Sequence, residues 1–203
     1  MNNFTWWEKT VEYKFVVDAV VNRLCDFAAP LSGRHERTAG DAAFGMDSML
    51  VLVEFKRKLA DLPTEETLFH NYGDAKAQLV EYGHHFIVFA HLNDNDPASL
   101  ELVGRHYFVP GEYCRALDVM RYGVKKEVFD EYLEALSTHK KADGRGSGHV
   151  STEGMSSVIG VSADGKLIGA MSLHDYAPSL FPAPVPLPSP PPAPKFTPSG
   201  PSM

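Results

Sequence analysis

The stretch LVLVEFKRK (residues 50–58) decides the fold expected of this chain. Its run of Leu, Val and Phe is typical of a buried β-strand, yet the run ends with Glu54 and Lys56. Because side chains alternate along a strand, these two residues lie on one face. Burying two charges at the end of an apolar strand costs free energy unless something pairs with them. Two interpretations follow: a solvated ion pair at a strand end, or part of a functional site.

The composition indicates one domain of ordinary size with a hydrophobic core. The chain has 203 residues, of which 44% are hydrophobic, enough to bury a sizeable interior. No apolar run reaches the length of a membrane span, and the N-terminal residues lack the features of a secretory signal. We therefore expect a cytoplasmic protein with no membrane partner.

Charge and cysteine content exclude some classes of site. The formal net charge of -7 provides no general attraction to nucleic acid, so a nucleic-acid enzyme would need a local basic patch, a bridging metal or a partner. Cys25 and Cys114 are the only cysteines. We expect reduced thiols, too few for a four-cysteine zinc or iron–sulfur site.

The chain divides by composition into four parts. Residues 1–138 are expected to form the main α/β domain, and residues 139–157 a Gly- and Ser-rich loop or linker. Residues 158–176 predict a β-hairpin that turns at ADGK and packs on the core. Residues 177–203 are dominated by Pro, which predicts a disordered or polyproline tail. The tail is expected either to bind a protein partner or to act as an inert tether.

Apolar periodicity and turn residues place further elements within the main domain. A short helix is expected after Pro63, with Thr64 as its cap. The predicted helices span residues 4–27, 74–83 and 115–139, the last broken near Gly123, and the predicted strands span residues 38–44, 49–56, 84–92 and 100–109. Helices that alternate with strands in this way favour an α/β fold.

A predicted hairpin suggests a second carboxylate for the site. If GMDS (residues 45–48) is a four-residue loop, Asp41 lies opposite Leu52 and on the same face as Glu54. Asp47 is out of phase with Glu54 and is rejected as a ligand. Two carboxylates about 7–8 Å apart diagonally across a strand pair can hold one divalent cation between them. Their hard oxygens suit Mg²⁺ or Mn²⁺.

These residues together predict a centre that cleaves phosphodiester bonds. A metal held by Asp41 and Glu54 would lower the pKa of a bound water and polarise a phosphoryl group. Lys56 would then position or deprotonate that water and offset the charge that develops on the phosphate. Arg57 and Lys58, directly after it, would add positive charge for the phosphate backbone, although a run of charges is more often a solvated surface.

This pattern resembles the PD-(D/E)xK, or restriction-endonuclease-like, nuclease superfamily. Gly40-Asp41 matches the "PD" element and Glu54-Phe55-Lys56 the "ExK" element, while Gln78 and Tyr82 resemble the Q-x-x-x-Y motif of RecB-like and Cas4-like nucleases. The resemblance implies a central mixed sheet flanked by helices and a Mg²⁺- or Mn²⁺-dependent deoxyribonuclease. It also implies that Gln78 and Tyr82 support the active site and the DNA backbone. The cluster cysteines of Cas4-like proteins are missing.

Several alternatives remain open in the sequence. The resemblance implies a metal-binding Glu on the first helix, for which Glu8 is favoured over Glu12. The histidines of the chain show no ligand spacing for zinc. The alternative function is a catalytically silent subunit that keeps the nuclease fold within a nucleic-acid-processing complex. Exonuclease or endonuclease activity, strandedness and the formation of homo-oligomers are not decided by the sequence.

Overall fold

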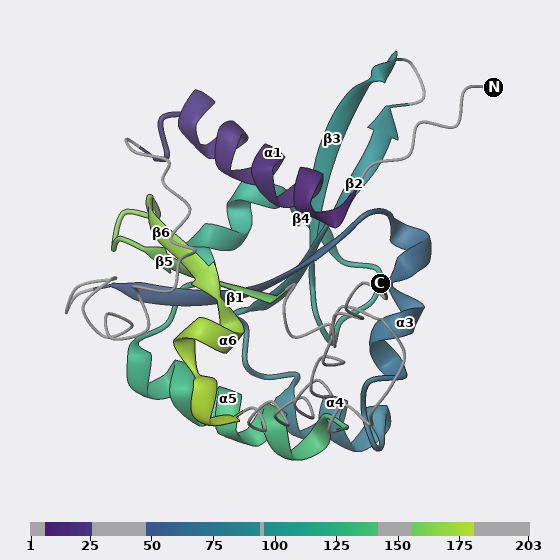
Figure 1. Ribbon diagram of the computed structural model, residues 1–203, viewed down its shortest axis with the longest axis vertical. Helices are drawn as coiled ribbons and strands as arrows, with labels where there is room; N and C mark the ends of the chain where they lie inside the picture. The colour runs from purple at the N-terminus through teal and green to yellow at the C-terminus, as the bar shows by residue number, and fades with distance from the viewer. Residues whose placement is uncertain (1–6, 26–47, 94–95, 142–155, 181–203) are drawn as a thin grey trace, which may run out of the picture.

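A six-stranded mixed β-sheet forms the centre of the protein (Figure 1). The computed structural model describes residues 7–25, 48–93, 96–141 and 156–180. The strands are β1 (Met49–Lys56), β2 (His85–Asn93), β3 (Asp96–His106), β4 (Tyr113–Arg115), β5 (Ser156–Val161) and β6 (Leu167–Ser172), in the order β4-β3-β2-β1-β5-β6. Strands β1 and β2 are parallel, and the other neighbouring pairs are antiparallel. The prediction of an α/β fold with a mixed sheet is therefore confirmed.

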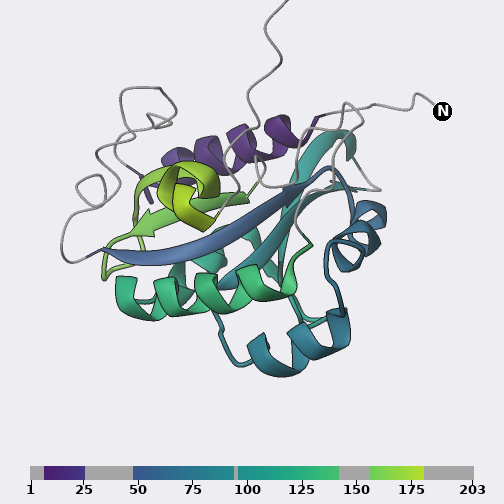
Figure 2. The same ribbon diagram turned by 60° about the horizontal axis from the view of Figure 1, so that its bottom comes forward.

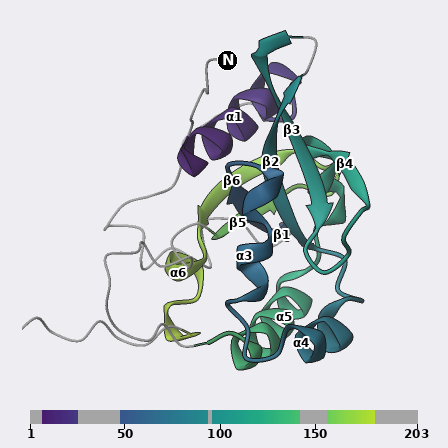
Figure 3. The same cartoon turned by 90° about the vertical axis from the view of Figure 1, so that its right-hand side faces the viewer.

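Helices cover both faces of the sheet. Figure 2 shows α1 on one side of β1 and α5 on the other, and Figure 3 shows α4 beside α5, away from α1. The helices are α1 (Glu8–Val21), α3 (Pro63–Glu66), α4 (Tyr72–Leu79), α5 (Lys126–His139) and α6 (Leu173–Tyr176), with 3-10 turns at Leu59–Asp61, Ala116–Tyr122 and Pro178–Leu180. Within the described ranges, no helix is long and apolar enough to cross a membrane.

Strand β1 separates two hydrophobic cores. Val51, Val53 and Phe55 pack with α1, where Phe15 meets Phe55 edge to face with ring centroids 5.7 Å apart. The alternate residues of β1 point to the layer that contains α4 and α5. That second core is closed by these buried residues of α5: Phe129, Tyr132, Leu133 and Leu136. The period-two pattern of the strand thus builds a three-layer domain.

The helices differ in their ends from the sequence prediction: α1 ends at Val21, α4 ends at Leu79, and Ala116–Tyr122 is a 3-10 turn before α5. Thr64 is not a cap: Pro63 is the first residue of α3, and the Thr64 hydroxyl donates to the Asp61 carbonyl. Helix α4 begins earlier than residue 74, because the side chain of Asn71 accepts hydrogen bonds from the N–H groups of Gly73 and Asp74. An Asn at this position satisfies amides that the helix itself leaves unpaired.

The predicted pairing of residues 38–44 with residues 49–56 is wrong. Met49 to Glu54 pair with β5 along one edge of β1. On the other edge Leu50 pairs with Val124, and the strand continues beside β2 from Leu52. Both edges are therefore occupied where the hairpin was expected. Residues 38–44 themselves lie outside the described part of the chain.

The C-terminal hairpin is part of the sheet, and its strands contribute residues to both hydrophobic cores. Strands β5 and β6 turn through ADGK as predicted, with Gly165 at a φ of +77°, a conformation that side chains with a Cβ rarely adopt. Strand β5 pairs directly with β1, so residues 156–161 lie beside the strand that carries Glu54. Of the predicted linker (residues 139–157), His139 lies in α5 and Ser156 and Ser157 lie in β5, while residues 142–155 lie outside the described ranges. Of the predicted tail (residues 177–203), Pro178–Leu180 form a 3-10 turn, and residues 181–203 lie outside the described ranges.

Candidate active site

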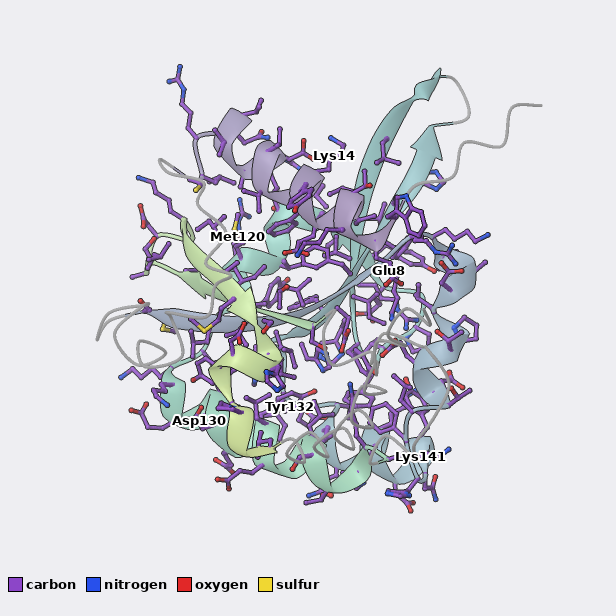
Figure 4. The ribbon with its side chains drawn as sticks, viewed as in Figure 1. Glu8, Lys14, Met120, Asp130, Tyr132 and Lys141 are labelled. Atoms are coloured by element: carbon purple, nitrogen blue, oxygen red, sulfur yellow. The ribbon has the colours of Figure 1, made fainter. Side chains whose placement is uncertain are left out.

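The end of β1 carries a buried ion pair between Lys56 and Glu65. The Lys56 Nζ atom lies 2.5 Å from Oε1 of Glu65, which comes from α3, and the two residues are 3% and 2% exposed. Glu8, which Figure 4 labels, lies in the first turn of α1. Its Oε1 atom is 4.0 Å from Nζ of the same lysine. Residues from three elements thus meet at the Lys56 amine. A solvated ion pair at the end of a strand would involve only two residues and would be exposed to water.

Glu54 lies on the same face of β1 and is completely buried. Its Oε1 accepts a hydrogen bond from the hydroxyl of Ser156, which is its register partner on β5. The same oxygen lies 3.4 Å from Nζ of Lys140, the residue directly after α5. The other oxygen, Oε2, has no hydrogen-bond partner among the described residues, and an unpaired buried carboxylate oxygen is costly.

Burial controls the charge states of these groups. Loss of water raises the pKa of the Glu54 carboxyl, and the nearby Lys140 and Lys56 amines offset only part of this effect. Burial also raises the pKa of Glu8, against the opposing effect of Lys56 and Arg57. For Lys56, burial alone would lower the pKa, but the surrounding carboxylates of Glu65, Glu54 and Glu8 outweigh it and raise the pKa. The lysine is therefore held as a cation.

An aromatic cluster packs beneath the charged groups. The Tyr107 hydroxyl donates to Oε2 of Glu65 at 2.7 Å, and its ring stacks on His85 with centroids 3.9 Å apart. The Tyr132 hydroxyl is hydrogen-bonded to Nδ1 of His85. Nζ of Lys140 lies 5.9 Å from the ring centroid of Tyr107, within the range of a cation–π contact. These contacts restrict how far Glu65 and Lys140 can move.

The predicted motif residues Gln78 and Tyr82 contact α5. Oε1 of Gln78 is 2.8 Å from Nε2 of His139, and the Tyr82 hydroxyl donates to Glu131 at 3.3 Å. Gln78 thus contacts the residue before Lys140, whereas Tyr82 lies beyond the end of α4 and contacts the middle of α5. Their role in supporting an active site stays a prediction.

The structure also separates Glu8 from Glu12. Glu12 forms an ion pair with Lys9 at 2.7 Å on the outer part of α1, whereas Glu8 approaches Lys56. The basic residues that follow the strand point outward: Arg57 bonds to Asp61 at 3.1 Å, and Lys58 is exposed. Of the two helix carboxylates, only Glu8 has a contact with the strand-end lysine.

Asp41, the other predicted metal ligand, lies outside the described residues. In the ranges that are described, no group of three or more His, Cys, Asp or Glu side chains is arranged to hold a metal ion. Cys25, which is buried, and Cys114, which is partly buried, do not form a disulfide. A metal at this strand end would therefore need a further ligand in addition to Glu54 and Glu8.

Sequence reasoning missed Glu65, Lys140 and Ser156. The sequence places Glu65 in the first turn of a short helix, where a carboxylate interacts favourably with the helix dipole. One signal was present: Leu62, Glu65 and Phe69 have helical spacing, and all three are buried. No local pattern marks Lys140 or Ser156, because each reaches Glu54 only through the tertiary fold.

Comparisons with known proteins do not identify a relative. No family model, curated protein or solved structure matches the chain.

Proposed function

We propose that this protein is a metal-dependent nuclease that hydrolyses phosphodiester bonds, with DNA as its substrate. The observation that carries the proposal is the approach of Glu8, from α1, to Lys56, which shares a strand face with Glu54. The PD-(D/E)xK resemblance implies a carboxylate on the first helix beside the ExK pair, and the fold brings one there. DNA is proposed because the nucleases that the motifs resemble act on it.

The carboxylates at the site fit a hard divalent cation. The unpaired, buried Oε2 of Glu54 is available as a ligand, and the positive charge of a cation would oppose the burial that raises the pKa values of Glu54 and Glu8. Mg²⁺ and Mn²⁺ prefer such oxygens and keep several waters. We propose Asp41 as a further ligand. A bound metal would polarise the phosphoryl group and lower the pKa of a water.

The residues of the chain would orient and stabilise the reacting groups. In hydrolysis, a water oxygen bonds to phosphorus, the bond from phosphorus to the leaving oxygen breaks, and a proton ends on the leaving oxygen. Lys56, as a buried ammonium group, would donate hydrogen bonds to the phosphate as negative charge develops on it. Arg57 and Lys58, which follow β1, would bind the neighbouring phosphates of the DNA backbone. Their positive charge would offset the repulsion between DNA and the negative net charge of the protein.

The deciding experiment measures cleavage of labelled linear and circular DNA, single- and double-stranded, with Mg²⁺ or Mn²⁺. Wild type should cut, and Lys56→Ala should lose about 100-fold or more in rate, the scale of a lost charge-stabilising group. Lys166→Ala is the matched control, because Lys166 lies in the β5–β6 turn beside Asp164. An RNA arm tests the choice of substrate. If no substrate is cut with either metal, catalysis by this chain is rejected.

A second candidate, a silent nuclease-fold subunit, is favoured by one observation. Lys56 forms an ion pair with Glu65, and Lys140 forms an ion pair with Glu54. The charges of Lys56 and Glu54 therefore already have partners within the protein. Thermal melting separates the two functions, because a metal that binds only the folded state raises the melting temperature. A rise with millimolar Mn²⁺ that is lost in Glu54→Gln and Asp41→Asn supports the nuclease. A melting temperature that is unchanged by metal supports the silent subunit.

A further inference from the structure

A second amine, that of Lys140, reaches the carboxylate face of β1. Its Nζ atom lies 3.4 Å from Oε1 of Glu54, and Lys140 is the residue directly after α5. The side chain of Lys140 is 20% exposed, whereas that of Lys56 is 4% exposed and in direct contact with Glu65. Of these two amines, that of Lys140 is therefore the more accessible to a ligand from solvent.

The position of the Lys140 amine is fixed by more than its ion pair. The backbone of Lys140 pairs with Phe69 as an isolated β-bridge, and the N–H of Lys141 donates to the Leu68 carbonyl at 2.8 Å. The Lys140 Nζ atom also lies 5.9 Å from the ring centroids of both Phe69 and Tyr107, within the range of a cation–π contact. The backbone bridge and the two rings thus limit where this amine can lie.

We infer that Lys140 binds a phosphate group of the DNA at this strand end, in addition to Lys56. The inference rests on the proposed nuclease function, and it adds a binding residue that no local motif marks. An ammonium group has three N–H donors. Among the described residues, the one hydrogen-bond acceptor of the Lys140 amine is Oε1 of Glu54, which leaves donors for the oxygens of a phosphate.

The geometry at Glu54 favours a ligand over a purely internal ion pair. Oε1 of Glu54 already accepts a hydrogen bond from Ser156, and the contact from Lys140 at 3.4 Å is longer than the usual charge-assisted hydrogen bond of about 2.7–2.9 Å. The other oxygen, Oε2, has no partner among the described residues. A divalent cation at Oε2 and a phosphate oxygen at the Lys140 amine would supply the missing partners of both groups.

The first test is the salt dependence of DNA binding, because each phosphate that a lysine neutralises adds to that dependence. Anisotropy follows the binding of a labelled single-stranded oligonucleotide in Ca²⁺, which takes the same oxygen ligands as Mg²⁺. Gel electrophoresis checks that the DNA is intact. Lys140→Gln should reduce the slope of log K against log salt by about 0.7. An unchanged slope overturns the inference.

Lys141→Gln is the matched control for this measurement. It removes the same charge from the next residue, whose amine donates to the Thr67 carbonyl at 2.9 Å. Lys141→Gln should keep the wild-type slope, and Lys140→Arg, which keeps the cation, should keep it as well. An equal reduction in Lys140→Gln and Lys141→Gln would assign the effect to net charge and overturn a specific contact.

The second test separates a contact with phosphate from support of Glu54 as a metal ligand. At saturating Mn²⁺, Lys140→Gln should lower kcat/KM for DNA cleavage about 100-fold, the scale of one lost charge-stabilising donor. More Mn²⁺ should not restore the rate, because removing a neighbouring ammonium group favours a cation at Glu54. Recovery at high Mn²⁺ would mean that Lys140 acts through the metal, and it would overturn the contact with phosphate.

Wild-type protein provides a test that does not depend on the folding of Lys140→Gln. In ¹³C-lysine-labelled protein with Ca²⁺, added oligonucleotide should shift the side-chain NMR signal of Lys140 and leave that of Lys141 in place. Lys140→Arg and Lys141→Arg assign the two signals. A Lys140 signal that does not move when DNA is bound overturns the inference.

The outcomes separate failure of the inference from failure of the proposed function. If wild type cuts DNA and Lys140→Gln binds and cuts like wild type, the contact is overturned and the nuclease stands. If wild type binds DNA with a slope that depends on Lys140 but cuts nothing, the contact stands and catalysis is rejected. If wild type does not bind DNA, both are overturned.

Discussion

The two faces of strand β1 differ in what they bury. On the side covered by α1, the strand residues are Val51, Val53 and Phe55, and they remain apolar to the end of the strand. On the side covered by α4 and α5, two leucines are followed by Glu54 and Lys56. Both faces are equally inaccessible to water, since every residue from Leu50 to Lys56 is buried. Burial therefore does not explain where the charges are placed.

The comparison indicates that the strand does not need the charged face in order to form a core. Replacing a buried ion pair by apolar residues of similar volume is often neutral or stabilising, whereas removing one partner is strongly destabilising. The apolar face shows that this strand and its neighbours can form a core without charges. A charged cluster at one end of the opposite face is what a site for a ligand would require, and three experiments test the contrast.

The largest expected effect is on the apolar face. Phe55→Ala removes a ring that packs edge to face on Phe15 of α1 and leaves a cavity between helix and sheet. Such substitutions cost about 3–5 kcal/mol of the free energy of unfolding. Urea unfolding monitored by circular dichroism measures the loss. A loss below about 1 kcal/mol would mean that α1 does not depend on this contact.

The second effect concerns the charged face. Lys56→Met should cost about 3 kcal/mol, because Glu65 is left buried without its cation. The double variant Lys56→Met with Glu65→Leu should recover part of this loss, since it removes both charges. A double-mutant cycle from urea unfolding measures the coupling, which we expect to be about 2 kcal/mol. Additive losses would show that the two residues do not stabilise one another.

The smallest effect is a pH dependence of the free energy of unfolding, and it comes from His84, in the layer that also contains α5. His84 packs against Phe129 and Tyr132, and burial, followed by the charge of His106, lowers its pKa to about 4. Because an unfolded histidine titrates near 6.5, its contribution to stability is present above pH 6.5 and is lost as the pH falls toward 4. About 2 kcal/mol should be lost at pH 5.

His84→Phe tests this dependence. The variant has no titrating ring at this position, so its free energy of unfolding should fall less than that of wild type between pH 8 and pH 5. Urea unfolding at both pH values gives the difference, with pH 8 as the internal reference where the ring is neutral in both states. An unchanged loss would assign the acid sensitivity to other groups.

Local sequence patterns predicted the parts of the fold that depend on local physics. The alternation of side chains placed Glu54 and Lys56 on one face, and helical spacing placed α1 and the helical segment before Lys140. These predictions needed only periodicity and turn residues. The choice of Glu8 as a metal ligand rested on the family resemblance and stays a prediction; its carboxylate lies 4.0 Å from Nζ of Lys56.

The strand that pairs with β1 could not be predicted in the same way. A short loop made residues 38–44 the natural partner, because loop closure favours near neighbours. The tertiary fold selects β5 instead, which offers a fully buried run of Val and Ile. The same change brings Ser156 to Glu54. Asp41 was placed through the incorrect hairpin, so its role as a ligand now rests on the motif alone.

The pairing of β1 with β5 has a consequence for the order in which the protein can be assembled. Ser156 lies 102 residues after Glu54, and Lys140 lies 86 residues after it. During synthesis β1 emerges first, and the Glu54 carboxylate gains these partners only after 86 and 102 further residues have been made. A chain that stops before β5 has an open strand edge at β1 and no enclosed charge cluster. Any reactivity of the cluster is thus withheld until β5 has been made.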